Sequence, residues 1–79
     1  MTDLETEREH LAKANRDLVE GERRVSAQML LIERMRVGER DTSDAELLLL
    51  MLQQSLQAWQ NHRKLILQAI TRLESSASA

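Results

Sequence analysis

The segment Gly38-Glu39-Arg40-Asp41-Thr42-Ser43-Asp44 concentrates the stop and start signals for helices in this chain of 79 residues. Gly38 suits the left-handed position just past a helix end, because glycine has no Cβ to clash there. The chain has no proline and only one other glycine, so few other places can break a helix. The sequence therefore predicts an all-α fold in which two long helices are joined by one bend.

The second helix has several candidate starting residues. Ser43 followed three residues later by Glu46 is a capping-box pattern, and Asp41 and Thr42 are competing caps. We expect one helical-hairpin domain over residues 1–79. Its expected parts are a first helix over about 3–37, a loop over 38–42, a second helix over about 43–74, and a frayed tail over 75–79.

Both predicted helices carry seven-residue repeats of the kind that line a coiled-coil seam. In the first helix the two lines of the seam are Leu4, Leu11, Leu18, Val25 and Ile32, and Glu7, Ala14, Gly21, Gln28 and Met35. In the second helix the central line is Ala45, Leu52, Trp59, Ile66 and Leu73. The line three positions after it is Leu48, Ser55, His62 and Ala69, and the line four positions after it is Leu49, Leu56, Arg63 and Ile70. These lines are flanked by Met51, Ala58 and Leu65.

Folding the helices antiparallel about the bend predicts which residues meet. Leu48 is expected opposite Ile32, Ser55 opposite Val25, and His62 opposite Leu18. The large ring of Trp59 is expected over Gly21, whose missing side chain leaves room for it. The residues predicted to pack inside the hairpin are Leu11, Leu18, Gly21, Val25, Ile32 and Trp59.

One hairpin leaves part of the second helix without cover. Residues 47–62 contain no Asp, Glu, Lys or Arg, and the run 47–52 is apolar around nearly the whole helix. A chain of this size rarely gains more than about 3–5 kcal/mol from one core. We therefore expect a homodimer that forms a four-helix bundle. The predicted dimer or partner interface is Leu47, Leu48, Leu49, Leu50, Met51, Leu52, Leu56, Trp59, Ile66 and Ile70.

Composition narrows the class of protein. There is no cysteine, and the formal net charge is −2, which gives no electrostatic reason to expect nucleic acid or a membrane surface. The first residues are acidic and polar, unlike a signal peptide. The uncharged run 47–62 is too short and too rich in glutamine to span a bilayer. A cytoplasmic protein is expected.

Few residues are candidates for a metal site or a catalytic site. Glu7 and His10 have the Glu-x-x-His spacing of di-iron bundles, but the second helix supplies no matching inward carboxylates, so a solvated first turn is favoured. The hairpin is expected to keep the two histidines far apart, with His62 in the seam as a pH-sensitive contact or, more simply, a hydrogen-bonded seam residue. We expect no cofactor, no metal, no small-molecule substrate and no enzymatic activity.

Two binding alternatives stay open. Arg16 and Arg23 lie one heptad apart on the outer face of the first helix, as in a ROP-like nucleic-acid-binding regulator, although interleaved acidic residues favour a solvated surface. Met29, Met35 and Met51 could form an adaptable groove for the helix of a protein partner, although the same surface could make the homodimer core.

The chain also resembles a family of short uncharacterised bacterial helical-hairpin proteins, which have Glu-Gly-Glu-Arg in the first helix and Gly-x-x-Asp-Thr at the bend. The resemblance covers about residues 10–70. It depends on the segment Glu20-Gly21-Glu22-Arg23-Arg24-Val25 with Gln28 and Ile32, and then on Gly38, Asp41-Thr42, Ala45, Leu48-Leu49, Leu56, His62-Arg63 and Ile66. Leu52, Gln53 and Trp59 depart from the family pattern and make the second helix more apolar. The resemblance implies a helical hairpin of bacterial origin, and since the family has no established activity it implies no particular chemistry.

Overall fold

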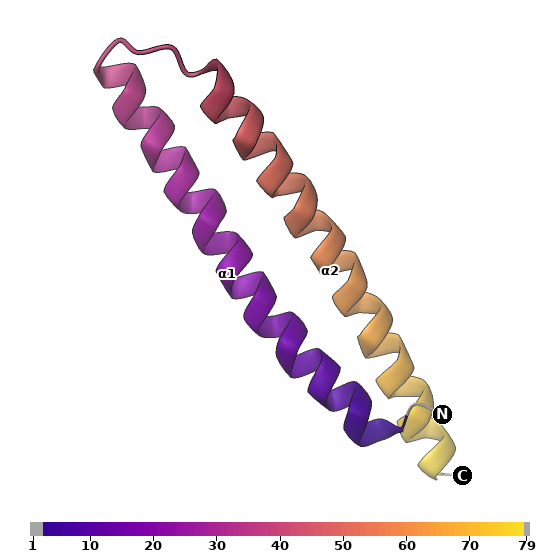
Figure 1. Ribbon diagram of the computed structural model, residues 1–79. Coiled ribbons are helices and arrows are strands. Elements are labelled where there is room, and N and C mark those ends of the chain that lie inside the picture. Colours follow the sequence, from indigo (N-terminus) through magenta and orange to yellow (C-terminus); the bar gives the residue numbers. More distant parts are fainter. Residues whose placement is uncertain (1–2, 79) are drawn as a thin grey trace.

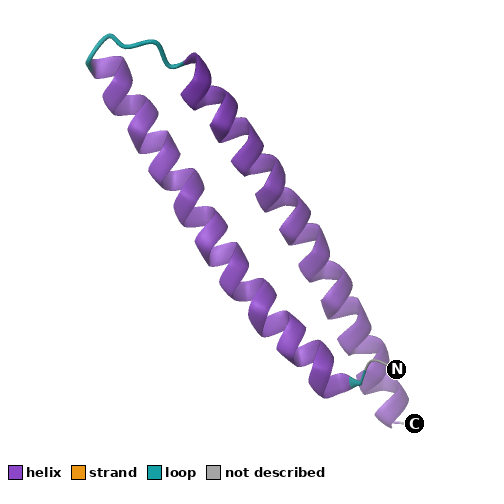
Figure 2. Ribbon diagram, in the orientation of Figure 1, coloured by secondary structure: helices purple, strands orange, loops and turns teal. Residues whose placement is uncertain are grey.

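The protein is an antiparallel hairpin of two long helices, α1 (Leu4–Val37) and α2 (Ser43–Ser78) (Figure 1). The computed structural model describes residues 3–78, and within that range there are helices and one bend but no strand (Figure 2). The hairpin is a rod of 63 × 16 × 15 Å. The predicted all-α class and the helical hairpin are confirmed.

The start of α1 is capped by Asp3. Its Oδ1 accepts a hydrogen bond from the backbone N–H of Thr6 at 2.8 Å, which satisfies one of the free donors of the first turn. The same hydrogen bond lowers the pKa of the Asp3 carboxyl below its ordinary value. Glu5 and Glu7 follow in the first turn, where negative charge is favourable to the helix dipole.

The end of α1 differs from the prediction, because Glu39 and not Gly38 takes the left-handed position. Gly38 has φ −83° and ψ 7°, whereas Glu39 has φ 55°. The N–H of Glu39 donates to the carbonyl of Arg36 at 3.0 Å, and that of Arg40 donates to Met35 at 2.9 Å. These two bonds are the pair of a Schellman motif, which closes one residue later than the glycine suggests.

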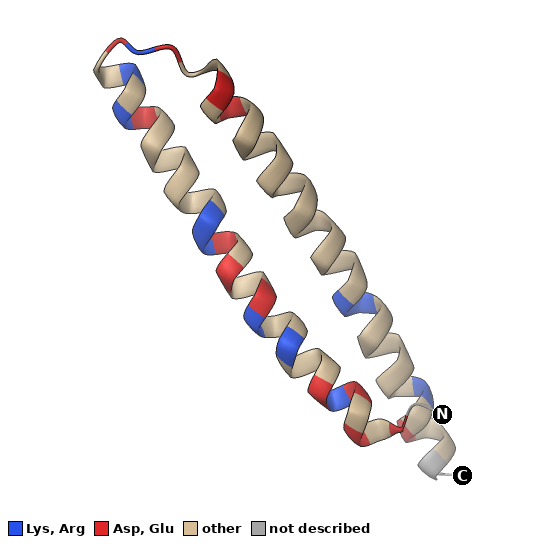
Figure 3. Cartoon of the chain, in the orientation of Figure 1, with Lys and Arg blue, Asp and Glu red and all other residues tan. Residues whose placement is uncertain are grey.

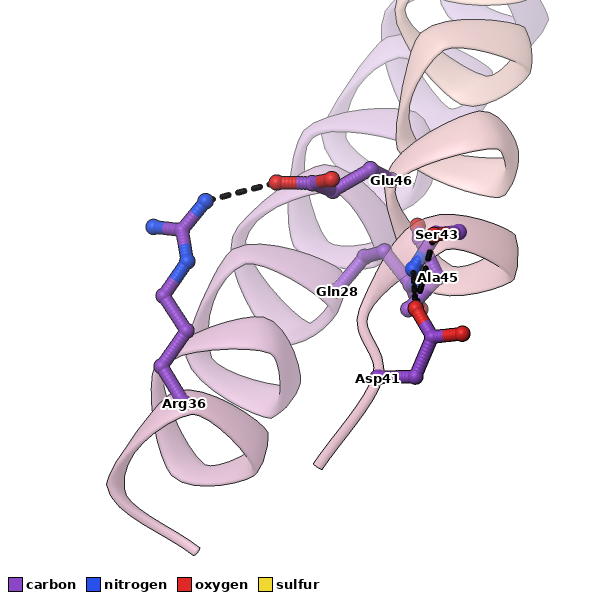
Figure 4. A network of polar contacts seen from close by, with 6 residues as sticks. All are labelled: Gln28, Arg36, Asp41, Ser43, Ala45 and Glu46. Carbon is purple, nitrogen blue, oxygen red and sulfur yellow. Dashed lines mark hydrogen bonds and ion pairs between the residues drawn. The ribbon is translucent and has the colours of Figure 1, made fainter. Parts of the chain in front are cut away.

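The bend is held by side chains from both helices (Figure 4). Asp41 Oδ1 accepts from the hydroxyl of Ser43 at 2.7 Å and from its backbone N–H at 2.9 Å, and both lower the pKa of Asp41. The capping box predicted between Ser43 and Glu46 is wrong, because Glu46 Oε1 instead lies 2.6 Å from Arg36 Nη2. Asp41, one of the competing caps, satisfies the N–H of Ser43 from the position just before Thr42, whose carbonyl accepts from the N–H of Glu46 at 2.8 Å.

Helix α2 continues to Ser78, four residues beyond the expected end at about 74. The segment that was expected to fray is therefore helical through residue 78. The physical reason is that serine and alanine are compatible with a helix and that no glycine or proline follows Glu74.

The two lines of the α1 seam face α2. Ala14, Gln28 and Ile32 are buried, and the remaining members are half-buried: Leu4, Glu7, Leu11, Leu18, Gly21, Val25 and Met35. Near the bend, Gln28 is held by a hydrogen bond from its Nε2 to the carbonyl of Ala45 at 2.8 Å. This bond satisfies the one polar side chain that is buried within the described part of the chain.

The face that α2 turns toward α1 differs from the predicted one. Leu48, Ser55 and His62 were expected in the seam, but all three are exposed. The line four positions later faces α1 instead, and its members are half-buried or buried: Leu49, Leu56, Arg63 and Ile70. This line has larger apolar side chains than the other, so turning it inward buries more apolar surface.

The hydrophobic core contains few buried side chains. Its main cluster consists of Ala14, Ile66 and Ile70, against which Leu4 and Leu11 pack. The accessible surface of the hairpin is 6181 Å², whereas a compact monomer of its mass would expose about 4,900 Å². The single chain therefore exposes much more surface than a compact protein of this size.

Candidate functional site

An apolar surface surrounds the half of the hairpin nearest the bend. We call it the apolar collar, and its side chains are each between 46% and 58% exposed: Met29, Leu30, Leu31, Leu47, Leu48, Leu50 and Met51. The two helices are uncharged at this level, over residues 25–32 of α1 and 47–62 of α2. Figure 3 shows this as a tan zone below the charged bend. A surface of this kind is typical of a protein interface.

The predicted interface residues lie at different depths in the hairpin. Leu47, Leu48, Leu50 and Met51 are exposed, as an intermolecular interface requires, whereas Leu49, Leu52 and Leu56 are half-buried. Ile66 and Ile70 lie in the core of the hairpin, so α1 already covers them.

The sequence-based interface missed the contribution of α1. Met29, Leu30 and Leu31 are exposed beside the exposed leucines of α2, and Leu65 of α2 is also 61% exposed. The uncharged run over residues 25–32 was the signal that could have identified the α1 part. The collar therefore involves both helices and not α2 alone.

The ring of Trp59 lies between the core and the solvent. An added Cβ on Gly21 would lie 3.4 Å from Trp59 Cζ3 and only 3.1 Å from Leu56 Cδ1, so both side chains cover the glycine. Trp59 is nevertheless 37% exposed. Its description as a core residue is corrected: one part of the ring fills the space over Gly21, and the other part borders a surface groove.

That groove brings the two histidines together. It has a volume of ≈ 260 Å³ and is lined by His10, Lys13, Ala14, Asp17, Trp59 and His62. The antiparallel register places both histidines on one side of the seam, where they line the same groove. Sequence reasoning missed this, since it assigned His62 to the seam itself.

Three polar side chains of the groove are engaged with close neighbours in the sequence. Lys13 Nζ lies 2.8 Å from Asp17 Oδ2, and His10 Nδ1 lies 3.8 Å from Glu7 Oε1. Within the described residues, no three His, Asp or Glu side chains gather as a metal site would need. The groove offers an aromatic edge and a few charges, and it adjoins the apolar surface of α2.

The outer face of α1 carries the basic residues of the alternative prediction. Arg24 Nε pairs with Glu20 Oε1 at 3.3 Å. Arg16 and Arg23 form no ion pair with any described residue, and together with Val19 they border a shallow hollow on this face. Two guanidinium groups one heptad apart are therefore free to contact a phosphate backbone.

Comparison with known proteins does not extend these observations. No family model, no curated protein and no solved structure matches the chain. Among the residues that the structure describes, no helix is both long enough and apolar enough to cross a membrane.

Proposed function

We propose that the protein is a cytoplasmic, non-enzymatic interaction module that works as a homodimer, in which two hairpins form a four-helix bundle. The observation that carries this proposal is the apolar collar, whose leucine and methionine side chains remain about half exposed around both helices. Soluble monomers rarely leave so many large apolar side chains together in water. A second hairpin of the same shape would cover part of this surface.

The amount of surface also supports association. The excess over a compact monomer is about 1,300 Å², and each partner in a typical stable interface buries about 800 Å². The thin core supports the same conclusion, because a two-helix hairpin with few buried side chains gains stability when a partner covers its apolar faces.

Concentration-dependent unfolding tests the proposal. If folding is linked to dimerisation, the urea midpoint of the native chain rises with protein concentration. A variant with glutamine at Leu47, Leu48, Leu50 and Met51 is expected to lose this dependence. The control is Val19→Gln, which changes an exposed apolar residue of α1 outside the collar. A midpoint that does not change with concentration in the native chain would contradict the proposal.

A small nucleic-acid-binding regulator is the alternative function, and the unpaired Arg16 and Arg23 favour it. Binding of this kind weakens steeply as salt increases, because it depends on phosphate contacts. A salt-dependent shift of RNA or DNA that is lost in Arg16→Ala/Arg23→Ala would support it. The control is Arg24→Ala, since Arg24 is already paired with Glu20.

A further inference from the structure

Helix α2 carries a second heptad line that α1 does not cover. We call it the second seam, and its residues are spaced alternately by three and four positions: Leu48, Met51, Ser55, Ala58, His62 and Leu65. All six are exposed, and Leu48, Met51 and Leu65 are 46%, 55% and 61% exposed. Alternate spacing by three and four residues is the pattern that packs against another helix in a coiled coil.

The side chains of the second seam vary in size along its length. Larger side chains lie at its two ends, with Leu48 and Met51 toward the bend and Leu65 toward the termini. Small side chains lie in the middle, at Ser55 and Ala58. Small residues at the centre allow two helices to approach closely there, while the larger side chains fill the space on either side.

The charges at the ends of the second seam determine how a second copy would lie. Asp44 lies four residues before Leu48, and Arg72 lies seven residues after Leu65, beyond the half-buried Ala69. Neither charged residue forms an ion pair within the described hairpin. A parallel pair of α2 helices would place Asp44 beside Asp44 and Arg72 beside Arg72. An antiparallel pair places Asp44 beside Arg72 at both ends, which is favourable.

From these observations we propose that the second seam is a self-complementary interface, in which α2 packs antiparallel against α2 of a second copy. Ala58 is midway between Asp44 and Arg72, so the two-fold axis passes close to Ala58. The charged pairs then lie about 42 Å apart at the two ends of the interface. This proposal rests on the proposed homodimer and specifies which face of the hairpin forms it.

The interface also accounts for the exposed part of Trp59. The ring borders the groove that His62 lines, and His62 belongs to the second seam. A second copy seated on the second seam would cover the mouth of this groove. In this arrangement Trp59 contacts Gly21 on one side and the neighbouring protomer on the other.

Disulfide crosslinking in the full-length chain tests the geometry, because the native protein has no cysteine. A disulfide forms only between residues whose Cα atoms approach within about 7 Å. We expect Ala58→Cys to form a covalent dimer on mild oxidation, and Asp44→Cys mixed with Arg72→Cys to form a covalent heterodimer. Asp44→Cys alone should not crosslink, and neither should the control Gln57→Cys, which is exposed next to Ala58 but points about 100° away from it around α2.

Charge exchange supplies an independent measurement. Asp44→Arg should weaken dimerisation by about fivefold, since it places two arginines together at both ends, and Asp44→Arg/Arg72→Asp should restore it. A native dimer in which Asp44→Cys crosslinks to itself, or in which Ala58→Cys does not crosslink, would overturn the antiparallel seam. A native chain that is monomeric at the same concentration would instead refute the proposed homodimer itself.

Discussion

The packing of α2 over Gly21 makes a quantitative prediction about helix stability. Glycine inside a helix is about 0.8–1.0 kcal/mol less favourable than alanine. The Cβ of an alanine at position 21 would lie 3.1 Å from Leu56 Cδ1 and 3.4 Å from Trp59 Cζ3. The nearer atom is the end of a half-buried, flexible side chain, so it can move by a few tenths of an ångström. We expect this movement to offset about half of the gain, and Gly21→Ala to stabilise the protein by about 0.5 kcal/mol.

A second substitution isolates the contact. In a Leu56→Ala background the nearest atom is gone, so Gly21→Ala should give close to the full gain of about 1 kcal/mol. Gly21→Leu places a larger side chain against Leu56 and Trp59 and should destabilise the native protein by about 1–3 kcal/mol. Urea unfolding followed by circular dichroism at one fixed protein concentration measures all of these changes.

Two results would contradict the packing of Leu56 and Trp59 over Gly21. If Gly21→Ala has the same effect with and without the Leu56 side chain, Leu56 does not limit the space over the glycine. If Gly21→Leu is as stable as the native protein, neither Leu56 nor Trp59 packs there. Either outcome would show that the register of the two helices is different.

Four further substitutions test the bend and the groove. Glu39→Gly should stabilise the protein by about 0.5–1 kcal/mol in urea unfolding, since a left-handed residue with a Cβ is strained. Gly38→Ala should leave the stability unchanged, because Gly38 has a right-handed backbone conformation. A large loss of stability in Gly38→Ala would place the left-handed residue at Gly38 after all. Trp59→Ala should cost about 2–3 kcal/mol, less than for a core tryptophan, because the ring is 37% exposed; a cost below about 1 kcal/mol would contradict its packing over Gly21. The pKa of Asp41 is lowered by folding, so its stabilising effect is complete above its unfolded pKa of about 3.9 and is lost as the pH falls through the lower folded value. The difference in stability between the native protein and Asp41→Ala should therefore become smaller in acid. A difference that becomes larger in acid would contradict the hydrogen bonds from Ser43 to the Asp41 carboxylate.

The sequence correctly predicted which residues of α1 face α2, but it did not predict which face of α2 is turned toward α1. In α1 the line from Leu4 is apolar throughout, and of the two lines three or four positions after it only the one from Glu7 is largely apolar or small, so the pattern has one solution. In α2 the lines starting at Leu48 and Leu49 flank the central line on opposite sides, and both begin with leucine. Their difference in buried area decides between them, and that difference depends on the packing against α1.

Local hydrogen bonds account for most of the other differences. The left-handed residue is Glu39 because the bonds that close α1 involve Arg36 and Met35, and residue type alone does not fix where they form. Of the three adjacent residues that could cap α2, Asp41 supplies the side chain that accepts from Ser43, while Glu46 pairs with Arg36. The shared groove of the histidines follows from the rotation of α2 and was missed together with it.

The mass of the native protein in solution shows whether two hairpins associate. Sedimentation equilibrium across a range of micromolar concentrations is expected to give twice the chain mass of 9.1 kDa. On dilution the dimer is expected to dissociate into single hairpins. A constant mass of 9.1 kDa over the whole range, with the helices intact, would contradict the proposed homodimer.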